Sequence, residues 1–173
     1  MNEVVSVLID EKTLARRVSE LGNQISDELE GTTPIMIGVL RGGSIFHADL
    51  IRNISLKLQI DFISVKSYGS TTESSGIVEL GRDIESNIRG QDVVLVEDII
   101  DSGETIRFLV KHLKLRRPSS IRLCSLLSKP SRTKFDIPID YLGFEVPDQF
   151  IVGYGLDFDQ KFRNLPYLGV LGP

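Results

Sequence analysis

Acidic, hydroxyl and glycine residues follow an apolar run in the segment VVLVEDIIDSGET, residues 93–105. A buried carboxylate is costly unless something pairs with it, so Glu97, Asp98 and Asp101 suggest a ligand site at the end of a buried strand. A sharp turn through Gly103 into a helix would point backbone N–H groups at one spot, which favours a bound phosphate. Carboxylates beside that spot can accept hydrogen bonds from sugar hydroxyls. The segment therefore predicts a sugar-phosphate site.

The same residue types also allow purely structural interpretations. Asp101 or Ser102 would then be only the N-cap of the following helix. Further along the chain, Lys129 would be a solvated lysine at a strand end, Phe150 a core residue and Asp157 an acid in an ordinary turn. Taken one at a time, these residues leave both interpretations open.

Alternating strands and helices are predicted to position the site. Strand patterns occupy residues 34–40, 59–68, 92–100 and 120–128, and helical spacing of apolar residues occupies 12–30, 44–55 and 103–117. Ser44 is the predicted cap of the second helix. This order predicts an α/β fold with a central, mainly parallel sheet flanked by helices, whose binding crevice lies at the carboxyl ends of the strands. After residue 130 the pattern breaks into short pieces, which predicts a small C-terminal subdomain.

Length and composition narrow the class of protein. The chain has 173 residues, which favours one domain with one sizeable core. With 20 basic and 24 acidic residues, the net charge of −4 argues against nucleic acid as a partner. Cys124 is the single cysteine, which excludes an intrachain disulfide and fits a reducing compartment. The sequence has no signal-like start and no run of 18 apolar residues, so we expect a cytoplasmic protein without a membrane partner.

A longer pattern in the opening segment resembles a known motif. The segment has two acids after a run of aliphatic residues, then two more aliphatic residues, then Asp-Ser-Gly and a Thr two places later. This order resembles the phosphoribosyl-diphosphate (PRPP) motif of the type I phosphoribosyltransferases. Other segments are similar to successive parts of the bacterial hypoxanthine-guanine branch: GVLRGG (38–43), KSYGS (66–70), SLLSKPSR (125–132) and GFEVPDQFIVGYGLDFDQKFRNLPYLGVL (143–171). The resemblance covers nearly the whole chain, in order.

The resemblance implies a type I phosphoribosyltransferase fold and an activity. The expected fold is a single domain, 1–173, with a hood formed mainly by about 130–173 and the N-terminal segment as a further candidate. The implied activity is purine salvage: magnesium-dependent transfer of the 5-phosphoribosyl group from PRPP to hypoxanthine or guanine, giving IMP or GMP and pyrophosphate. Relatives form dimers or tetramers, which implies a homodimer or homotetramer here.

For the ribose phosphate, the resemblance implies roles for the residues of the opening segment. The 5′-phosphate of PRPP would be held by residues 101–105, which are Asp101, Ser102, Gly103, Glu104 and Thr105. Glu97 and Asp98 would face the ribose hydroxyls, and both are candidate metal ligands. Asp101 would lie near N7 of the purine and act as its proton acceptor or hydrogen-bond partner.

For the purine, the resemblance implies four residues near the C-terminal end. Lys129 would point at the 6-oxo group and Phe150 would stack on the base. The backbone at Ile151 would meet the 2-position edge, and Asp157 would help to bind magnesium.

For pyrophosphate, the resemblance implies two loops and an arginine. The contacts would come from Arg41, Gly42, Ser67, Tyr68 and Arg163, with residues 67–76 as a flap over the reaction. A non-proline cis peptide is implied between Leu40 and Arg41. The chain departs from the family where Arg41 replaces the usual Lys, and where Glu104 adds a negative charge beside the 5′-phosphate.

Two alternatives stay open at the level of sequence. A phosphoribosyltransferase fold can serve as a regulator that senses nucleotides and binds RNA, but that use needs a basic face, and acids outnumber bases here. The accepted base could also be xanthine or a pyrimidine, although Lys129 with the segment GFEVPDQFIVGY favours 6-oxopurines.

Overall fold

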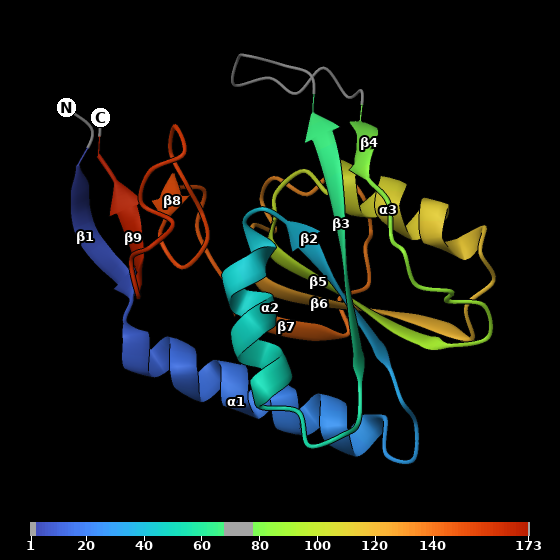
Figure 1. The fold of residues 1–173 in the computed structure, drawn as a ribbon. Helices are drawn as coiled ribbons and strands as arrows, with labels where there is room; N and C mark the ends of the chain where they lie inside the picture. The colour runs from blue at the N-terminus through green and yellow to red at the C-terminus, as the bar shows by residue number, and fades with distance from the viewer. Residues whose placement is uncertain (1–2, 68–77, 173) are drawn as a thin grey trace.

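The computed structural model describes residues 3–67 and 78–172, which form an α/β structure with two sheets (Figure 1). The larger sheet has six strands in the order β4-β3-β2-β5-β6-β7. Its parallel strands are β3 (Gln59–Ser67), β2 (Ile35–Leu40), β5 (Asp92–Ile100), β6 (Ser120–Ser128) and β7 (Tyr141–Glu145). At its edge, β4 (Val78–Arg82) runs antiparallel to β3. Parallel strands end on the same side of a sheet, so the ends of β2, β5 and β6 meet where such sheets bind ligands.

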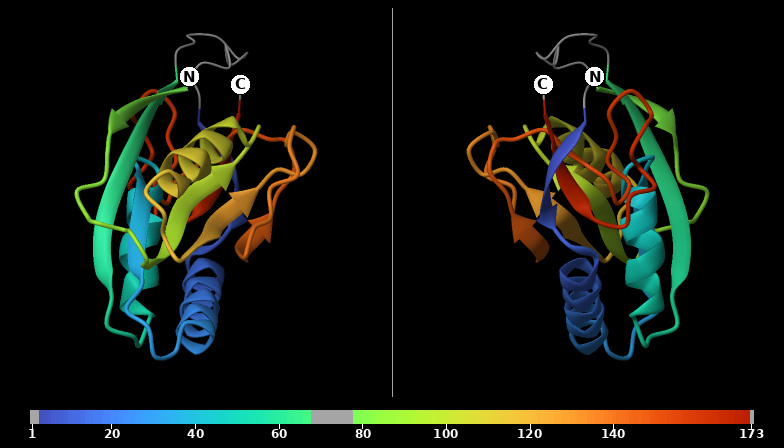
Figure 2. Two further views of the ribbon diagram at one scale, coloured as in Figure 1. Left: turned by 90° about the vertical axis from the view of Figure 1, so that its right-hand side faces the viewer. Right: turned by 90° about the vertical axis from the view of Figure 1, so that its left-hand side faces the viewer.

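Helices cover both faces of this sheet (Figure 2). On one face lie α1 (Glu11–Glu28) and α2 (Gly43–Arg52), and on the other lies α3 (Glu104–Lys114). Successive residues of a strand point to opposite faces. In β5, Val94 and Val96 belong to the core cluster under α1 and α2, whereas Val93 and Leu95 belong to the cluster under α3. Burial on both sides explains why β5 is an unbroken apolar run before its acids.

The smaller sheet combines the two ends of the chain, and we call this sheet, together with the segments 148–150 and 153–167 that flank β8, the hood. It consists of β1 (Val4–Ile9), β9 (Leu168–Leu171) and β8 (Ile151–Val152), antiparallel and in that order. Pairing of β1 with β9 places the N- and C-terminal ends side by side (Figure 1). Of residues 130–173, the segment Tyr141–Glu145 lies in the larger sheet as β7, and the N-terminal strand β1 lies in the hood.

The structure confirms the predicted fold class and corrects one detail. Each predicted strand and helix is present, and strand 120–128 has the predicted limits. The predicted cap of α2 is wrong: Gly42 is the N-cap, and the Ser44 hydroxyl donates instead to the Arg41 carbonyl at 2.7 Å. Cys124 is fully buried in β6. In the described part of the chain, no helix is both long and apolar enough to span a membrane.

Candidate active site

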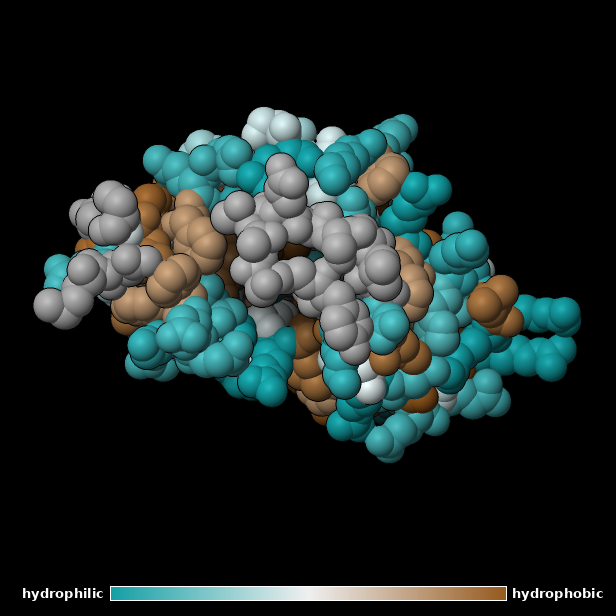
Figure 3. All heavy atoms as spheres, turned by 90° about the horizontal axis from the view of Figure 1, so that it is seen from above, coloured by the Kyte–Doolittle hydropathy of each residue, from teal (hydrophilic) through white to brown (hydrophobic). Residues whose placement is uncertain are grey.

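Two pockets lie at the carboxyl ends of the parallel strands. The first, which we call the turn pocket, has a volume of about 220 Å³ and lies between the β2–α2 loop and the β5–α3 turn. The second, which we call the hood pocket, has a volume of about 460 Å³ and lies between the ends of β5 and β6 and the segment 148–157. Asp98, Ile99 and Asp101 line both pockets. Seen from above, the coloured residues of this face are largely hydrophilic, with hydrophobic residues between them (Figure 3).

The carboxyl groups of Glu97 and Asp98 belong to adjacent residues at the end of β5, and both have raised pKa values. Glu97 is buried, and Asp98 is partly buried. Burial raises the pKa of Glu97 well above its usual value, and the neighbouring charge of Asp98 adds to the rise. Burial also raises the pKa of Asp98, while its backbone hydrogen bonds and the charge of Arg163 act in the opposite direction. A cation at this place would relieve the repulsion between the two carboxylates.

The turn from β5 into α3 has the geometry of an anion site. Gly103 is the N-cap of α3 at φ +84°, a conformation that favours glycine, and a Cβ there would lie 2.5 Å from Ile137 Cδ1. The N-cap residue of α3 is thus Gly103, which makes no side-chain hydrogen bond. The N-cap interpretation of Asp101 is therefore wrong, and its carboxylate accepts a hydrogen bond from Arg132 Nε at 2.5 Å. Ser102 Oγ accepts from the Glu104 amide at a long 3.4 Å, so it is no strong cap either.

Glu104 does not leave an uncompensated charge beside the turn. Its carboxylate forms an ion pair with Lys134, with 3.1 Å between Oε1 and Nζ. The side chain of Glu104 is largely buried, whereas that of Lys134 is exposed. The negative charge that departs from the family pattern is thus paired within the protein.

Lys129 and Phe150 take positions that their residue types alone do not predict. Lys129 is only 7% exposed, so its interpretation as a solvated lysine is wrong. Its Nζ lies 3.9 Å from Asp101 Oδ2 and 3.6 Å from Asp148 Oδ1. Phe150 is 52% exposed, so it is not a core residue, and its ring stands edge-on to Phe158 at 5.5 Å. The hood pocket therefore offers a buried cation and an exposed aromatic face.

Arginines from two distant segments converge beside Asp157. Arg163 donates to the Gly155 carbonyl at 2.7 Å, and its Nη2 lies 2.7 Å from Asp157 Oδ1. Asp157 Oδ2 accepts from the Gln160 amide at 2.8 Å, as a turn acid does. Gln160 Oε1 also accepts from Arg41 at 3.1 Å and from Arg163 at 3.3 Å. Asp157 thus serves the turn and at the same time orients a cation toward the site.

The loop after β2 contacts both the acids of β5 and the hood. The predicted cis peptide between Leu40 and Arg41 is confirmed. A Cβ on Gly42 would lie 1.6 Å from Asp98 Oδ2. A Cβ on Gly155 would lie 2.1 Å from the Gly42 carbonyl oxygen. Because backbone approaches this closely at both places, the loop, the acids and the hood form one continuous site.

The phosphoribosyl transferase domain family matches residues 5–159 of this chain. The chain belongs to the phosphoribosyltransferase family. It is 47% identical over 172 residues to a hypoxanthine-guanine phosphoribosyltransferase of Bacillus subtilis (strain 168). The matched residues cover 99% of this chain and 96% of that relative. A crystal structure of a hypoxanthine-guanine phosphoribosyltransferase from Bacillus anthracis has a TM-score of 0.93 at 48% identity, covering 97% of this chain and 99% of the other. A hypoxanthine phosphoribosyltransferase from Staphylococcus aureus has a TM-score of 0.94 at 40% identity, covering 98% and 92%.

Membership in this family makes the protein a transferase, and it raises the question of which residues could hold a magnesium ion. Among the described residues, no three His, Cys, Asp or Glu side chains are grouped to hold a metal ion by themselves. Mg²⁺ normally needs only one or two protein carboxylates, and it keeps waters and takes substrate phosphates. Asp98 and Asp157 both line the hood pocket, and Asp98 is adjacent to the Glu97 carboxyl group in the chain. The residues present therefore fit a phosphate-bound Mg²⁺ of this phosphoribosyltransferase.

Two predicted elements of the pyrophosphate site fall partly outside the described residues. Ser67 ends β3, and its side chain is not described. Tyr68 and the rest of the predicted flap lie outside the described residues. Their roles stay predictions.

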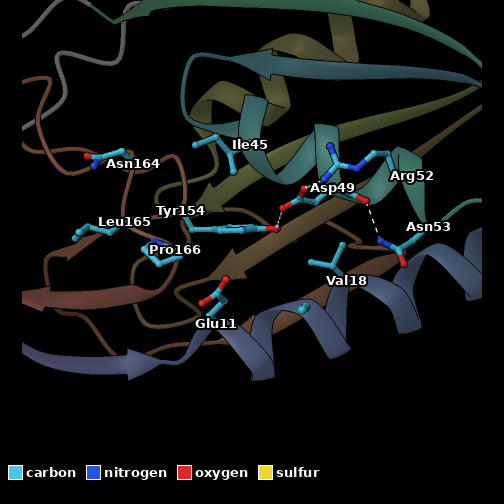
Figure 4. A pocket seen from close by; sticks show the side chains of 11 residues that line it. Glu11, Val18, Ile45, Asp49, Arg52, Asn53, Tyr154, Asn164, Leu165 and Pro166 are labelled. Atoms are coloured by element: carbon cyan, nitrogen blue, oxygen red, sulfur yellow. Dashed lines mark hydrogen bonds and ion pairs between the residues drawn. The ribbon is translucent and has the colours of Figure 1, made fainter.

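Beside a third pocket, a hydrogen bond connects the hood of this phosphoribosyltransferase to α2 (Figure 4). This pocket, of about 450 Å³, lies between α1, α2 and hood residues that include Tyr154. Tyr154 is buried at φ +48°, and its hydroxyl donates to Asp49 Oδ2 at 2.5 Å. Asp49 also pairs with Arg52 on the same helix. Because α2 directly follows the loop of Arg41 and Gly42, this contact fixes the hood relative to that loop.

Three residues of the site were not predicted from the sequence. Arg132 and Asp148 line the hood pocket beside Asp101 and Lys129, and Gln160 joins Arg41 to Arg163. Arg132 belongs to the segment SLLSKPSR, so a second cation three residues after Lys129 could have indicated that it lies at the site. Gln160 gave no such signal, because its contacts depend on a backbone at φ +63°.

Proposed function

We propose that this phosphoribosyltransferase acts in purine salvage and transfers the 5-phosphoribosyl group from PRPP to hypoxanthine or guanine, giving IMP or GMP and pyrophosphate. One observation carries the proposal: the turn pocket and the hood pocket share Asp98, Ile99 and Asp101. A ribose placed over these residues has an amide-lined turn on one side and a cation with an aromatic ring on the other. We also propose Mg²⁺ as the cofactor, the cytoplasm as the location and a homodimer or homotetramer as the assembly.

The turn pocket suits the ribose 5′-phosphate. The helix N-terminus after Gly103 and the backbone amides of residues 102–105 supply hydrogen-bond donors, and the Glu104 amide among them also donates to Ser102 Oγ at 3.4 Å. Glu97 and Asp98, which line this pocket, are the proposed acceptors of hydrogen bonds from the ribose hydroxyls. The ion pair between Glu104 and Lys134 lowers the negative charge that a phosphate would meet.

The hood pocket suits a 6-oxopurine. The buried ammonium of Lys129 is a donor for the 6-oxo group, and the exposed ring of Phe150 can stack on the base. The backbone at Ile151, at the start of β8, is the proposed partner of the 2-position edge. The 6-amino group of adenine is itself a donor, so donor types alone should exclude adenine.

The reaction requires charge of both signs to be stabilised. Displacement of pyrophosphate from the anomeric carbon leaves positive charge on the ribose and negative charge on the leaving group. Arg41, Gly42 and Arg163 are the proposed partners of the pyrophosphate. Asp98 and Asp157 would hold Mg²⁺, which when bound neutralises part of the diphosphate charge. Asp101 accepts the proton that the purine nitrogen must lose.

A spectrophotometric assay tests the proposal directly. The protein is incubated with PRPP and magnesium and with hypoxanthine, guanine, xanthine, adenine or uracil in turn. We expect conversion of hypoxanthine and guanine to nucleotides and none of adenine or uracil. Conversion of xanthine or uracil in place of hypoxanthine and guanine would contradict the proposed substrates while leaving family membership intact.

Lys129→Ala tests how the base is recognised. A hydrogen bond from a charged group contributes about 1.5 to 3 kcal/mol, so kcat/KM for hypoxanthine and guanine should fall roughly 10- to 100-fold. The KM for PRPP should stay close to that of the parent. Lys57→Ala, which changes an exposed lysine away from both pockets, is the control. An equally large loss of PRPP binding would show that Lys129 does not read the base.

Gln160→Ala tests whether the bridge between Arg41 and Arg163 prepares the pyrophosphate site. Loss of a neutral hydrogen-bond acceptor costs about 0.5 to 1.5 kcal/mol, so the Kd for pyrophosphate with magnesium should rise roughly 2- to 10-fold by titration calorimetry. Gln160→Glu should weaken binding further, because it adds a negative charge beside the anion. Lys161→Ala, which changes the exposed neighbour, is the control. Tight pyrophosphate binding by Gln160→Glu would contradict the proposed role of the bridge.

A further inference from the structure

Four side chains in the hood pocket form a ring of alternating charge. Arg132 Nε donates to Asp101 Oδ1 at 2.5 Å, and Arg132 Nη1 donates to Asp148 Oδ2 at 3.5 Å. Lys129 Nζ lies 3.9 Å from Asp101 Oδ2 and 3.6 Å from Asp148 Oδ1. Each cation therefore faces both anions, and each anion faces both cations. We call these four residues the charge ring.

The charge ring joins three separate segments of the chain. Asp101 lies in the β5–α3 turn, Lys129 and Arg132 follow β6, and Asp148 precedes β8. The two carboxylate oxygens of Asp101 have different neighbours, Arg132 at Oδ1 and Lys129 at Oδ2. Arginine presents a planar fork of donors, which fixes the orientation of a carboxylate more firmly than a flexible ammonium does. In this protein the fork of Arg132 spans two carboxylates, since Nε donates to Asp101 and Nη1 donates to Asp148.

Backbone contacts hold the loop of Arg132 independently of its side chain. The Lys129 amide donates to the Ile100 carbonyl at 2.9 Å, and the Lys134 amide donates to the Ser102 carbonyl at 3.1 Å. Thr133 Oγ1 donates to the carbonyls of Asp101 and Lys129, both at 3.1 Å. The Arg132 side chain is 44% exposed, and ion pairs at such exposure contribute little to stability. The fold therefore does not explain the Arg132 contact.

We propose that Arg132 is a positioning residue for catalysis, which orients the Asp101 carboxylate so that Oδ2 faces the purine proton. Asp148 completes the charge ring, because it holds the Arg132 guanidinium and the Lys129 ammonium in their places. The inference rests on the proposed function, in which Asp101 accepts the proton and Lys129 donates to the 6-oxo group. Arg132 itself need not touch either substrate.

A double-mutant cycle on Arg132 and Asp101 tests the inference. In the otherwise unchanged protein, Arg132→Gln should lower kcat/KM for hypoxanthine roughly 5- to 50-fold, since a small misplacement of a reacting group is costly. The KM for PRPP should change by less than about twofold, because the phosphate turn is intact. In an Asp101→Asn background, Arg132→Gln should lower kcat/KM by less than about twofold, because no proton acceptor is left to position.

Two further variants separate positioning from general structural effects. Arg132→Lys keeps the charge but not the planar fork, so it should recover only part of the loss. Arg16→Gln, which removes an exposed arginine paired with Glu20 on α1, should leave the kinetics unchanged. Melting curves of every variant accompany the rates, and Arg132→Lys serves for the comparison if Arg132→Gln folds poorly.

The possible outcomes distinguish a failure of the inference from a failure of the proposed function. An equal loss from Arg132→Gln in both backgrounds would overturn the inference, as would an Arg132→Gln variant with parental kcat/KM. Full recovery by Arg132→Lys would show that charge alone matters and would also overturn the orienting role. A parent protein that converts neither hypoxanthine nor guanine would instead overturn the proposed function, whatever the variants do.

Discussion

Asp101→Asn is expected to lower kcat with hypoxanthine roughly 10²- to 10⁴-fold, the usual contribution of a positioned general base. Asparagine keeps the shape of the side chain and one acceptor, but it lacks the basic oxygen that would take the purine proton. PRPP binding should change little, because the amides of residues 102–105 do not depend on this side chain. Steady-state rates with hypoxanthine beside a PRPP titration measure the two effects separately.

A melting curve completes the test of Asp101. The ion pair with Arg132 joins side chains that are 42% and 44% exposed, so its loss should cost at most about 1 kcal/mol of unfolding free energy. A large loss of activity at nearly parental stability is therefore the expected combination. If the Asn variant retains most of its turnover, Asp101 is not the proton acceptor, and the reaction needs another one.

The sequence predicts the large sheet well because its strands are buried on both faces. Their central runs, 93–96 and 123–127, can be recognised without knowledge of a partner, since each residue in them is buried. The hood strands differ, because β8 has two residues and β1 pairs with β9 across almost the whole chain. The short strand β7 becomes a strand through its pairing with β6. Periodicity within a short window cannot show such partners.

The site shows the same division between local and distant information. The turn through Gly103 follows from five consecutive residues, and so its conformation was predictable. The burial of Lys129 and the exposure of Phe150 depend on how the hood packs over the ends of the strands. The contact of Arg132 with Asp101 spans 31 positions of sequence. Neither hydropathy nor residue type determines contacts of this kind.

Gly155→Ala is expected to have the second large effect, because it acts on the contact between hood and loop. Gly155 has φ +106°, and an added Cβ would lie 2.1 Å from the Gly42 carbonyl oxygen, a backbone atom that cannot rotate away. Backbone strain and overpacking together should lower the free energy of unfolding by roughly 2 to 4 kcal/mol. For a chain of this size the melting temperature would fall by roughly 4 to 16 °C.

Gly31→Ala is the matched control for Gly155→Ala. Gly31 also has a left-handed φ of +81°, but no atom lies within 4 Å of its added Cβ. It therefore carries the strain of the backbone conformation without the collision, so the difference between the two variants measures the close approach of hood and loop.

The functional consequence of Gly155→Ala should fall on pyrophosphate rather than on the purine. Displacement of Gly155 also displaces its partner Arg163, and it moves the hood away from the loop of Arg41 and Gly42. Gly155→Ala should therefore weaken pyrophosphate binding, measured by calorimetry with magnesium at a temperature where the variant is folded. Gly31→Ala should leave that binding unchanged. If Gly155→Ala melts like Gly31→Ala and binds pyrophosphate like the parent, the hood and the loop are not in the close contact on which the continuous site depends.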